Sequence, residues 1–325
     1  MKMSELIVGG TAVTGMVHVY NEHASSAKLM KQVRNRLVQD LPDLNHKYIE
    51  TNLNLDKTII EIQDTVSSGD LVCVEGGETT MNTVARAMSS GELRGQLIPS
   101  LILDGGAYSD LSHMLHINSV AKRPTEVIRS SVLKVIYPIE FHIQPGDRNQ
   151  DARDEIAVCY GGIGAMAKTG ELINTRRTGK VLEIVRSNKL GRFTLGAILA
   201  AEGLARAKKF TIIDHKSGQD QQLGLTEFGY INGNRMAGGV ILTPVEIDDK
   251  RAVRIEASHK YSLIRELAGL ATGVSEGVVV SAIDDDFTLE SSAWFHRDAE
   301  HSLLTKGTRI SINRSTNPFY VLSDR

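Results

Sequence analysis

Residues 70–82, DLVCVEGGETTMN, decide how the first part of this chain folds. Residues 71–74 form a short apolar run between two acidic residues, which is typical of a parallel strand buried on both faces. Two glycines follow, and from Met81 to Met88 the apolar residues recur with the spacing of one helix face. A strand, a glycine turn and a helix in this order indicate one unit of a parallel β-α-β fold.

Similar units lie on both sides of this stretch. Apolar runs indicate further strands at residues 16–20 and 97–103, and HKYIET at residues 46–51 is interpreted as another strand. Helical periodicity separates these runs, as in the spacing of Met30, Val33 and Leu37. Repeated units of this length predict an α/β domain with a doubly wound parallel sheet, which binds ligands at the carboxyl ends of its strands.

The pattern changes near residue 120, where strands become frequent and helices rare. The expected strands lie at residues 132–143, 156–160, 210–213, 223–231, 253–257, 278–283 and 309–313. Two helices are expected among them, near residues 194–206 and 261–271. Many strands with few crossover helices predict a β-rich, antiparallel, sandwich-like second domain. We therefore expect a first domain at residues 1–122 and a second at residues 123–310.

The composition excludes several classes of protein. The chain has 325 residues, 41% of them hydrophobic and 23% charged, which suits two globular domains with real cores. The net charge of -2 gives no global field for a polyanion, so we expect no nucleic-acid partner. No apolar run approaches the roughly 18 residues of a spanning helix. The beginning of the chain does not resemble a signal peptide, and both cysteines lie in apolar runs, so a reducing cytoplasm is expected.

Two glycine turns are the candidate ligand sites. Gly76 and Gly77 end a buried strand and allow backbone N–H groups to approach a ligand, while the helix that follows favours anions at its N-terminus. The alternative is an ordinary strand-to-helix turn capped by a threonine, and the segment alone favours neither. A second turn, DGGAYSDLS at residues 104–112, again follows a strand and carries a carboxylate. Two such turns from neighbouring strands would converge on one crevice.

These motifs resemble the diacylglycerol kinase catalytic-domain family, which includes soluble bacterial lipid kinases and sphingosine kinases and has the NAD kinases as distant relatives. GGETT at residues 76–80 corresponds to the family's nucleotide loop, G-G-D-G-T, and Asn82 follows it. VCYGGIGAMA at 158–167 is similar to the strand and turn that open the family's second domain. INGNRMAGGVILTP at 231–244 is similar to its N-G-x-x-x-G-G-G stretch, and RDAE at 297–300 stands at its D-G-E.

The resemblance implies an ATP-dependent, Mg²⁺-requiring kinase that phosphorylates a hydroxyl group of a lipid or related acceptor. It assigns nucleotide binding to these residues: Gly76, Gly77, Thr79, Thr80, Gly106, Ser109 and Asp110. Asp298 is then the candidate general base, with Glu300 as its support. Glu78 takes a catalytic and metal-binding role, and Asp248 and Asp249 fall near the family's structural Mg²⁺ site. The resemblance also implies that residues 311–325 return to the first domain.

The departures from the family motifs support other functions. Glu78 replaces an aspartate, Thr79 a glycine and Ser109 an asparagine, which favours a catalytically degraded nucleotide- or ligand-binding protein of the same fold. A kinase of NAD or of another small molecule is a further alternative. GIGAMA at residues 162–167 fits G-x-G-x-x-A after a strand, the fingerprint of a dinucleotide-dependent oxidoreductase.

The expected partners are a nucleotide and a small amphiphilic or lipid acceptor. A lipid kinase must meet a bilayer, so the expected location is cytoplasmic with room for peripheral contact at the inner membrane face. No strongly basic amphipathic helix marks such a contact. A homodimer is compatible with the sequence.

Overall fold

The computed structural model describes two compact units. The described residues are 6–24, 27–52, 54–104, 111, 114–115, 124–147, 150–169, 202–216, 220–233, 235–236, 240–241, 251–265, 279–298 and 300–323. The first unit contains the described residues within 1–138, 233–250 and 315–325, and the second those within 139–232 and 251–314. The expected boundary at residue 122 differs from this division, and each unit is described by itself.

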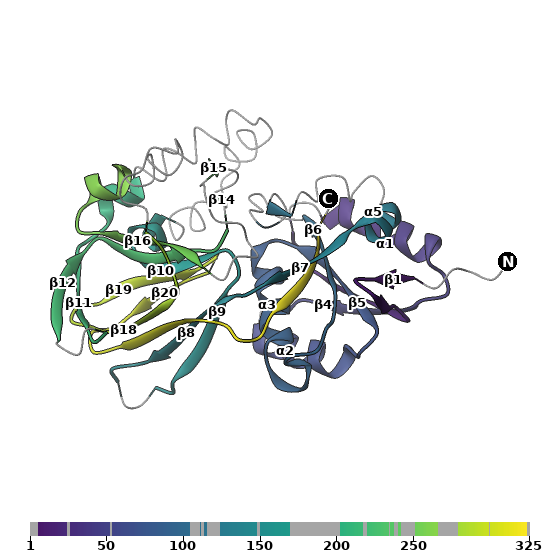
Figure 1. Cartoon of the computed structure of the whole chain (residues 1–325), viewed down its shortest axis with the longest axis horizontal. Coiled ribbons are helices and arrows are strands. Elements are labelled where there is room, and N and C mark those ends of the chain that lie inside the picture. Colours follow the sequence, from purple (N-terminus) through teal and green to yellow (C-terminus); the bar gives the residue numbers. More distant parts are fainter. Residues whose placement is uncertain are drawn as a thin grey trace. The chain divides into compact units, whose positions relative to one another are not determined.

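The first unit is built on a six-stranded sheet in the order β4-β3-β5-β6-β22-β7. Its strands are β3 (Gly15–Tyr20), β4 (Asn45–Glu50), β5 (Asp70–Gly76), β6 (Ser100–Asp104), β7 (Val132–Ile136) and β22 (Phe319–Ser323). The strands from β4 to β22 are parallel, and only β7 pairs antiparallel with its neighbour in this sheet. β22 comes from the end of the chain and lies between β6 and β7 (Figure 1).

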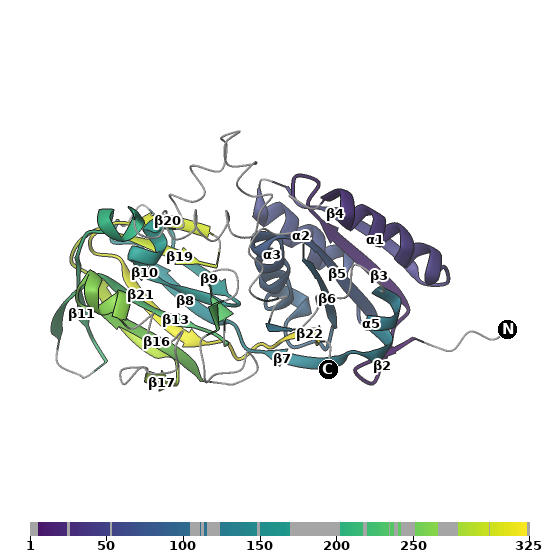
Figure 2. The same ribbon diagram turned by 90° about the horizontal axis from the view of Figure 1, so that it is seen from above.

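Helices cover both faces of this sheet. They are α1 (Ala27–Asp40), α2 (Leu55–Thr65), α3 (Glu78–Met88) and α5 (Pro124–Ser130), with a 3-10 turn, η1, at Gly91–Leu93. Met30, Val33 and Leu37 form the buried stripe of α1, as their spacing predicts. The Asn54 side chain accepts a hydrogen bond from the Lys57 backbone N–H and so caps α2. Figure 2 shows α1 and α5 on one face of the sheet and α2 and α3 on the other.

The order of the strands creates a switch point between β3 and β5. From β3 the chain passes through α1 to β4, whereas from β5 it passes through α3 to β6 in the opposite direction. Right-handed crossovers therefore place α1 and α3 on opposite faces, so that the two connections diverge at the carboxyl ends of β3 and β5. In open α/β sheets this is where ligands bind.

The second unit contains two antiparallel six-stranded sheets, in the orders β17-β16-β13-β10-β19-β20 and β12-β11-β18-β21-β8-β9. The strands of the first are β10 (Tyr160–Gly164), β13 (Glu227–Ile231), β16 (Ala252–Ala257), β17 (Val279–Ser281), β19 (Ala293–Arg297) and β20 (Glu300–Leu304). The strands of the second are β8 (Ile139–Gln144), β9 (Arg153–Ala157), β11 (Phe210–Asp214), β12 (Gln221–Leu225), β18 (Asp284–Leu289) and β21 (Arg309–Arg314).

Aromatic side chains from the two sheets form the core of the second unit. Phe141 of β8 contacts Phe295 of β19 edge to face, with ring centroids 5.1 Å apart. Phe287 of β18 contacts Phe228 of β13 in the same way, also at 5.1 Å. Each pair joins one sheet to the other, so the unit is a sandwich with a shared core. The α/β first unit and this antiparallel second unit confirm the predicted fold class.

Three predicted strands prove to be two strands each. The run at residues 132–143 divides at Pro138, with β7 in the first unit and β8 in the second. Proline lacks the N–H that a ladder needs, and its carbonyl instead accepts the backbone N–H of Ser315 at 2.9 Å. The runs at 156–160 and 223–231 divide at turns formed by residues 158–159 and by Thr226. The short strands β1 (Ile7–Val8), β2 (Thr11–Ala12), β14 (Arg235–Met236) and β15 (Val240–Ile241) form two small hairpins.

In the described part of the chain, every helix is too short or too polar to cross a bilayer. The helix expected near residues 194–206 is described only from Glu202 to Arg206, and the one expected near 261–271 only up to Arg265.

Candidate functional site

A cavity of about 230 Å³ lies at the switch point of the first unit, beside the carboxyl ends of β3 and β5. Three cations and two carboxylates are among its lining residues, which are Asn21, Glu22, Ala27, Lys28, Met30, Lys31, Arg34 and Glu75. The backbone N–H of Asn21 donates to the carbonyl of Glu75 at 3.1 Å and holds the two strand ends together. The cavity therefore lies where topology predicts a ligand, and basic side chains predominate in it.

Glu75 and Arg34 form a fixed ion pair in this cavity. Arg34 Nε donates to Glu75 Oε2 at 2.8 Å, and the Glu75 side chain is fully buried. The guanidinium of Arg34 also lies 3.7 Å above the centre of the Tyr20 ring, which stabilises it as a cation–π contact. These two contacts orient Arg34 with one edge on Glu75 and its plane on Tyr20, so its position in the cavity is set before any ligand binds.

The other oxygen of Glu75 contacts the buried His18, which in turn contacts the half-buried His46. His18 Nδ1 lies 2.8 Å from Glu75 Oε1, and His18 Nε2 lies 3.1 Å from His46 Nδ1. His46 Nε2 lies 2.9 Å from the carbonyl oxygen of Leu41. The chain of contacts runs from the cavity to the beginning of β4, and the sequence analysis did not identify it. The sequence feature that could have revealed this chain of contacts is His18, a polar residue at the centre of the apolar run MVHVY at residues 16–20.

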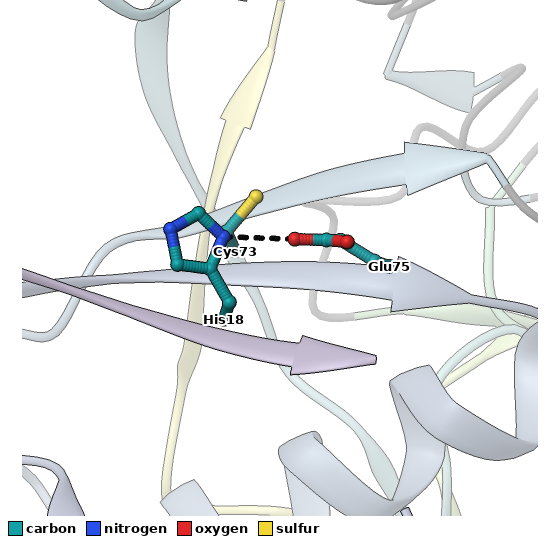
Figure 3. A group of neighbouring side chains, drawn as sticks. All are labelled: His18, Cys73 and Glu75. Atoms are coloured by element: carbon teal, nitrogen blue, oxygen red, sulfur yellow. Dashed lines mark hydrogen bonds and ion pairs between the residues drawn. The ribbon is translucent and has the colours of Figure 1, made fainter. Parts of the chain in front are cut away.

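His18 and Glu75 also cluster with Cys73, as Figure 3 shows. One ligand atom of each residue lies within 4.8 Å of the others, and nitrogen, sulfur and oxygen together are a donor set that Zn²⁺ accepts. However, burial and the neighbouring charge of Glu75 raise the pKa of the Cys73 thiol well above its usual value, so it stays protonated. Glu75 is already bound by His18 and Arg34, and the Arg34 charge opposes a second cation. The cluster is satisfied by hydrogen bonds and does not fit a metal site.

The GGETT turn lies directly after Glu75. Gly76 ends β5, Gly77 is the N-cap of α3, and Glu78 is the first helical residue. A Cβ added to Gly76 would lie 2.3 Å from Thr80 Oγ1, so Gly76 is required because Thr80 packs directly against the strand end. Thr80 is buried in this contact, whereas Thr79 is only half-buried. Of the two threonines, Thr79 is therefore the one open to a ligand.

A buried amide lies one helical turn after Glu78. Asn82 is 1% exposed, and neither its side-chain oxygen nor its nitrogen has a hydrogen-bond partner among the described residues. Glu78 is 9% exposed and lies four residues earlier on the same face of α3. Leaving a buried amide unsatisfied costs about 1–3 kcal/mol, and a polar ligand group at this turn would remove that cost.

The second glycine turn begins beside the first. In the pairing of β5 with β6, Gly76 is opposite Asp104, the last residue before that turn. The nucleotide-binding residues expected in it, Gly106, Ser109 and Asp110, lie outside the described residues. The expected metal residues Asp248 and Asp249 also lie outside them.

Asp298, the expected general base, lies in the second unit at the turn between β19 and β20. Its Oδ2 accepts the backbone N–H of Val158 at 2.8 Å, and its Oδ1 accepts those of Cys159 and Tyr160 at 2.9 Å each. Asp298 is 1% exposed, and it is the one non-glycine residue with positive φ, 44°, in the described part of the chain. Three backbone N–H donors fix the orientation of the carboxylate and occupy both of its oxygens. This geometry suits a residue that holds a turn better than one that exchanges a proton.

Glu300 lies two residues further on and remains closer to solvent. Its carboxylate pairs with Arg297, which also contacts Glu155 at 3.0 Å. The Glu300 side chain is 19% exposed. Asp298 and Glu300 are thus together in the second unit, whereas Gly76, Gly77 and Glu78 are together in the first.

Glu227 and His296 form a second buried pair that the sequence analysis missed. They flank the glycines of β10, with Glu227 Oε1 3.5 Å from His296 Nε2 in a space too narrow for a water molecule. Burial raises the pKa of Glu227 well above its usual value, although backbone N–H groups of Met166 and Ala165 oppose this. Burial also lowers the pKa of His296 to about 4, against the charge of Asp298. Both shifts have the same cause, since burial disfavours the charged form of the acid and of the imidazole alike.

The glycines of β10 explain the G-x-G-x-x-A motif at residues 162–167, which resembled a dinucleotide-binding fingerprint. A Cβ on Gly162 would lie 2.4 Å from the carbonyl oxygen of Phe228, and one on Gly164 would lie 2.2 Å from that of Thr226. These glycines lie inside an antiparallel sheet and allow β13 to approach closely. A helical segment at residues 165–169 follows directly, but the strand before it belongs to an antiparallel sheet and not to the parallel sheet that a dinucleotide fingerprint requires.

Comparison with solved structures identifies this fold. A diacylglycerol kinase from Bacillus anthracis strain Sterne shares 16% sequence identity over 95% of this chain and 97% of its own, with a TM-score of 0.65. A second structure described as a diacylglycerol kinase from that organism gives a TM-score of 0.63 at the same identity and coverage. A yeast NADH kinase complexed with NADH is more distant, with 10% identity over 96% of this chain and 84% of its own and a TM-score of 0.48. No protein-family model matches the chain, and no curated protein matches its sequence.

These likenesses establish a class of fold. The chain has the two-domain, diacylglycerol kinase-like fold that the motifs predicted. Fold alone does not determine activity, because one fold can carry several reactions.

Proposed function

We propose that this protein is an ATP-dependent kinase that transfers a phosphoryl group to a hydroxyl of a lipid or related amphiphile. The cation-lined cavity at the switch point between β3 and β5 carries the proposal. Phosphoryl transfer asks a protein mainly to position the phosphates and stabilise their charge. Lys28, Lys31 and Arg34 supply charge in this cavity, and the glycine turn adds backbone N–H groups at the beginning of α3.

The residues at the beginning of α3 fit a hard cation such as Mg²⁺. Glu78 offers a carboxylate, and Asn82 offers an amide oxygen that has no partner in the described part of the chain. These two residues would hold the ion, which would neutralise charge on the phosphate oxygens. Asp248 and Asp249 stay proposals for a second, structural ion. The replacement of aspartate by Glu78 keeps the charge and moves it one methylene further out.

We assign proton acceptance from the acceptor hydroxyl to Glu300 rather than to Asp298. Both oxygens of Asp298 accept backbone N–H groups, so its role in the proposal is to hold the turn before Glu300. Glu300 keeps partial access to solvent, and Arg297 orients its carboxylate. A general base must come within hydrogen-bond reach of the proton that it takes, which a partly exposed carboxylate can do.

ADP release tests the proposal directly. The assay offers ATP and Mg²⁺ with diacylglycerol, a sphingoid base or NAD as acceptor, because the lipid acceptor rests on the fold likeness. We expect release with an amphiphile, a loss of about 100-fold or more in Glu300→Gln, and a weaker apparent affinity for ATP in Lys28→Gln/Lys31→Gln. Lys57→Gln, an exposed lysine on α2, is the matched control and should behave like the wild type. Release with NAD alone would overturn the lipid assignment.

A binding protein without transferase activity is the second candidate. The helix already begins at Glu78, and Thr79 stands where a glycine would leave the backbone open to phosphate. Measuring the melting temperature together with ADP release distinguishes ligand binding from phosphoryl transfer, because a ligand that binds the native state raises the melting temperature. A rise with ATP and Mg²⁺ but no ADP release with any acceptor would favour this candidate over the kinase.

A further inference from the structure

The buried contacts beneath the cavity form one continuous chain. It runs from the Leu41 carbonyl through His46 and His18 to Glu75, and Glu75 in turn binds Arg34 in the cavity. The rings of His18 and His46 stack with centroids 5.4 Å apart, which fixes both imidazoles in place. Neither ring can turn to change partners without breaking the stack and two hydrogen bonds.

The chain requires one more proton than two neutral histidines carry. A carbonyl oxygen only accepts, so His46 Nε2 must donate to Leu41. The contact between His46 and His18 needs a second proton, and the contact between His18 and Glu75 needs a third. Two neutral imidazoles supply two protons between them. The third makes one ring cationic or is held by the carboxyl group of Glu75.

This extra proton determines how much positive charge faces the cavity. When it is present, the charge of Glu75 is compensated within the chain, and the charge of Arg34 is available to an anion. When it leaves, Arg34 alone must compensate Glu75, and the cavity loses one positive charge. Salt screens a charge beside a buried ion pair less than a charge at the surface. The gain or loss of this proton therefore changes the electrostatic attraction between the cavity and an anionic ligand.

The other groups packed around the chain do not compete for this proton near neutral pH. Burial and Glu75 raise the pKa of Cys73 on β5 well above its usual value, and burial raises that of Tyr20 on β3. Tyr48 on β4 stacks on His18 with ring centroids 5.2 Å apart, and α1 contributes Arg34, which stays charged. The two imidazoles and Glu75 are left to exchange the proton.

We propose that His18, with His46, is a positioning residue that couples anion binding in this cavity to the uptake of a proton. The ligand class is a phosphate anion, supplied by a nucleotide or by a free polyphosphate. Identifying that anion with ATP rests on the proposed function. The affinity for the anion falls as the pH rises, by up to about tenfold per pH unit for one linked proton.

Calorimetry in buffers of different ionisation enthalpy counts the protons taken up on binding. The probes are ATP with Mg²⁺ and inorganic tripolyphosphate, which distinguish a nucleotide from a free polyphosphate. The measurement is made over a pH series, because uptake is visible only where the free protein has lost the extra proton. At such a pH we expect the wild type to take up a larger number of protons than His18→Gln or His46→Gln, by a fraction approaching one. Comparing variants with the same probe cancels the titration of the phosphate itself. His142→Gln, an exposed histidine of the second unit, is the control and should match the wild type.

Equal proton uptake in the wild type and in both histidine variants would overturn the proposal, and so would a failure of both probes to bind. His46→Gln keeps the test decisive if His18→Gln does not fold, because His46 is only half-buried. ADP release tests the proposed kinase activity independently of the proton uptake. An active kinase with unchanged proton uptake overturns this inference alone, whereas linked binding without phosphoryl transfer overturns the kinase alone.

Discussion

At the scale of single residues, Asp298 shows how one carboxylate organises a fold. It binds three consecutive backbone N–H groups of the turn between β9 and β10, while its own N–H donates to the Tyr160 carbonyl at 2.7 Å. These bonds join residues that lie 138 to 140 positions apart in sequence, and they keep the donors of the turn satisfied inside the sandwich. The positive φ of Asp298 is a cost that these four bonds offset.

Asp298→Asn should therefore destabilise the protein by about 2–4 kcal/mol. An asparagine side chain presents an N–H₂ group where a carboxylate oxygen accepted a backbone N–H, so at least one buried donor is left without a partner. Denaturant unfolding measures the change. Glu300→Gln is the matched control, with a predicted change below about 1 kcal/mol. An Asp298→Asn variant of wild-type stability with abolished transfer would return the role of general base to Asp298.

The Glu227–His296 pair predicts how stability depends on pH. The pKa of Glu227 is raised in the folded state, so its contribution to stability is present below the pKa of an unfolded glutamate and is lost as the pH rises through the higher folded value. His296 acts in the other direction. Its pKa falls from 6.5 to about 4, so stability decreases as the pH drops between these values, by about 3 kcal/mol in total.

Glu227→Gln isolates the first of these effects. Glutamine resembles the protonated acid, accepts the Met166 N–H and has no charge to bury, so the variant should be more stable than the wild type at pH 8. Its unfolding free energy should also change less between pH 5 and pH 8. Unfolding series at several pH values test this, and an equally steep decline in the variant would show that Glu227 is not the group responsible.

At the scale of elements, the contact between the end of β5 and the first turn of α3 determines the geometry of the glycine turn. Gly76→Ala would place a methyl group against Thr80 Oγ1 and Cβ, which lie 2.3 and 2.6 Å from that position. We expect a loss of about 1–3 kcal/mol, because overpacking at a buried site displaces the backbone. Nucleotide affinity should fall with it if this turn binds the phosphates.

A double-mutant cycle identifies the cause of that loss. Thr80→Gly removes the obstructing side chain but by itself costs about 0.3 kcal/mol of helix propensity, together with the contacts of a buried side chain. The combined variant Gly76→Ala/Thr80→Gly should be more stable than the sum of the two single changes predicts. Additive changes would mean that Gly76 is retained for its backbone and not for the close approach of Thr80.

At the scale of the whole molecule, the first unit is assembled from distant parts of the chain. β22 enters the sheet between β6 and β7, and its pairing with β6 is parallel. Phe319, Val321 and Leu322 are buried there. The sheet therefore needs residues 319–323 before it is complete, and these residues are part of its core.

A variant that ends at Arg314 should lose the first unit. The sheet would lack an interior strand and three buried apolar side chains, a loss of about 5 kcal/mol or more. Thermal unfolding followed by circular dichroism measures the loss, and a variant that ends at Ser323 keeps β22 and serves as control. Unchanged melting of the shorter variant would show that β22 is dispensable.

Much of the architecture was predictable because it depends on local pattern. The i, i+3, i+7 spacing of Met30, Val33 and Leu37 and the apolar run of β5 are consequences of which face must be buried, and burial follows from side-chain chemistry. The glycine turn after β5 was visible for the same reason. The collinear order of its motifs then indicated a diacylglycerol kinase-like fold, which the structural likenesses confirm.

The partners of individual side chains were decided only by tertiary structure. Asp298 and Glu300 are alike in sequence as two acids near the end of the chain, yet one is enclosed by backbone donors and the other is not. His18 meets Glu75 and His46 because β3 lies between β4 and β5, an order that no local pattern records. Hydrophobic periodicity acts over one or two turns of chain, whereas hydrogen bonds of this kind join residues 28 to 140 positions apart. The chemistry of these carboxylates therefore depends on which strands the fold makes neighbours.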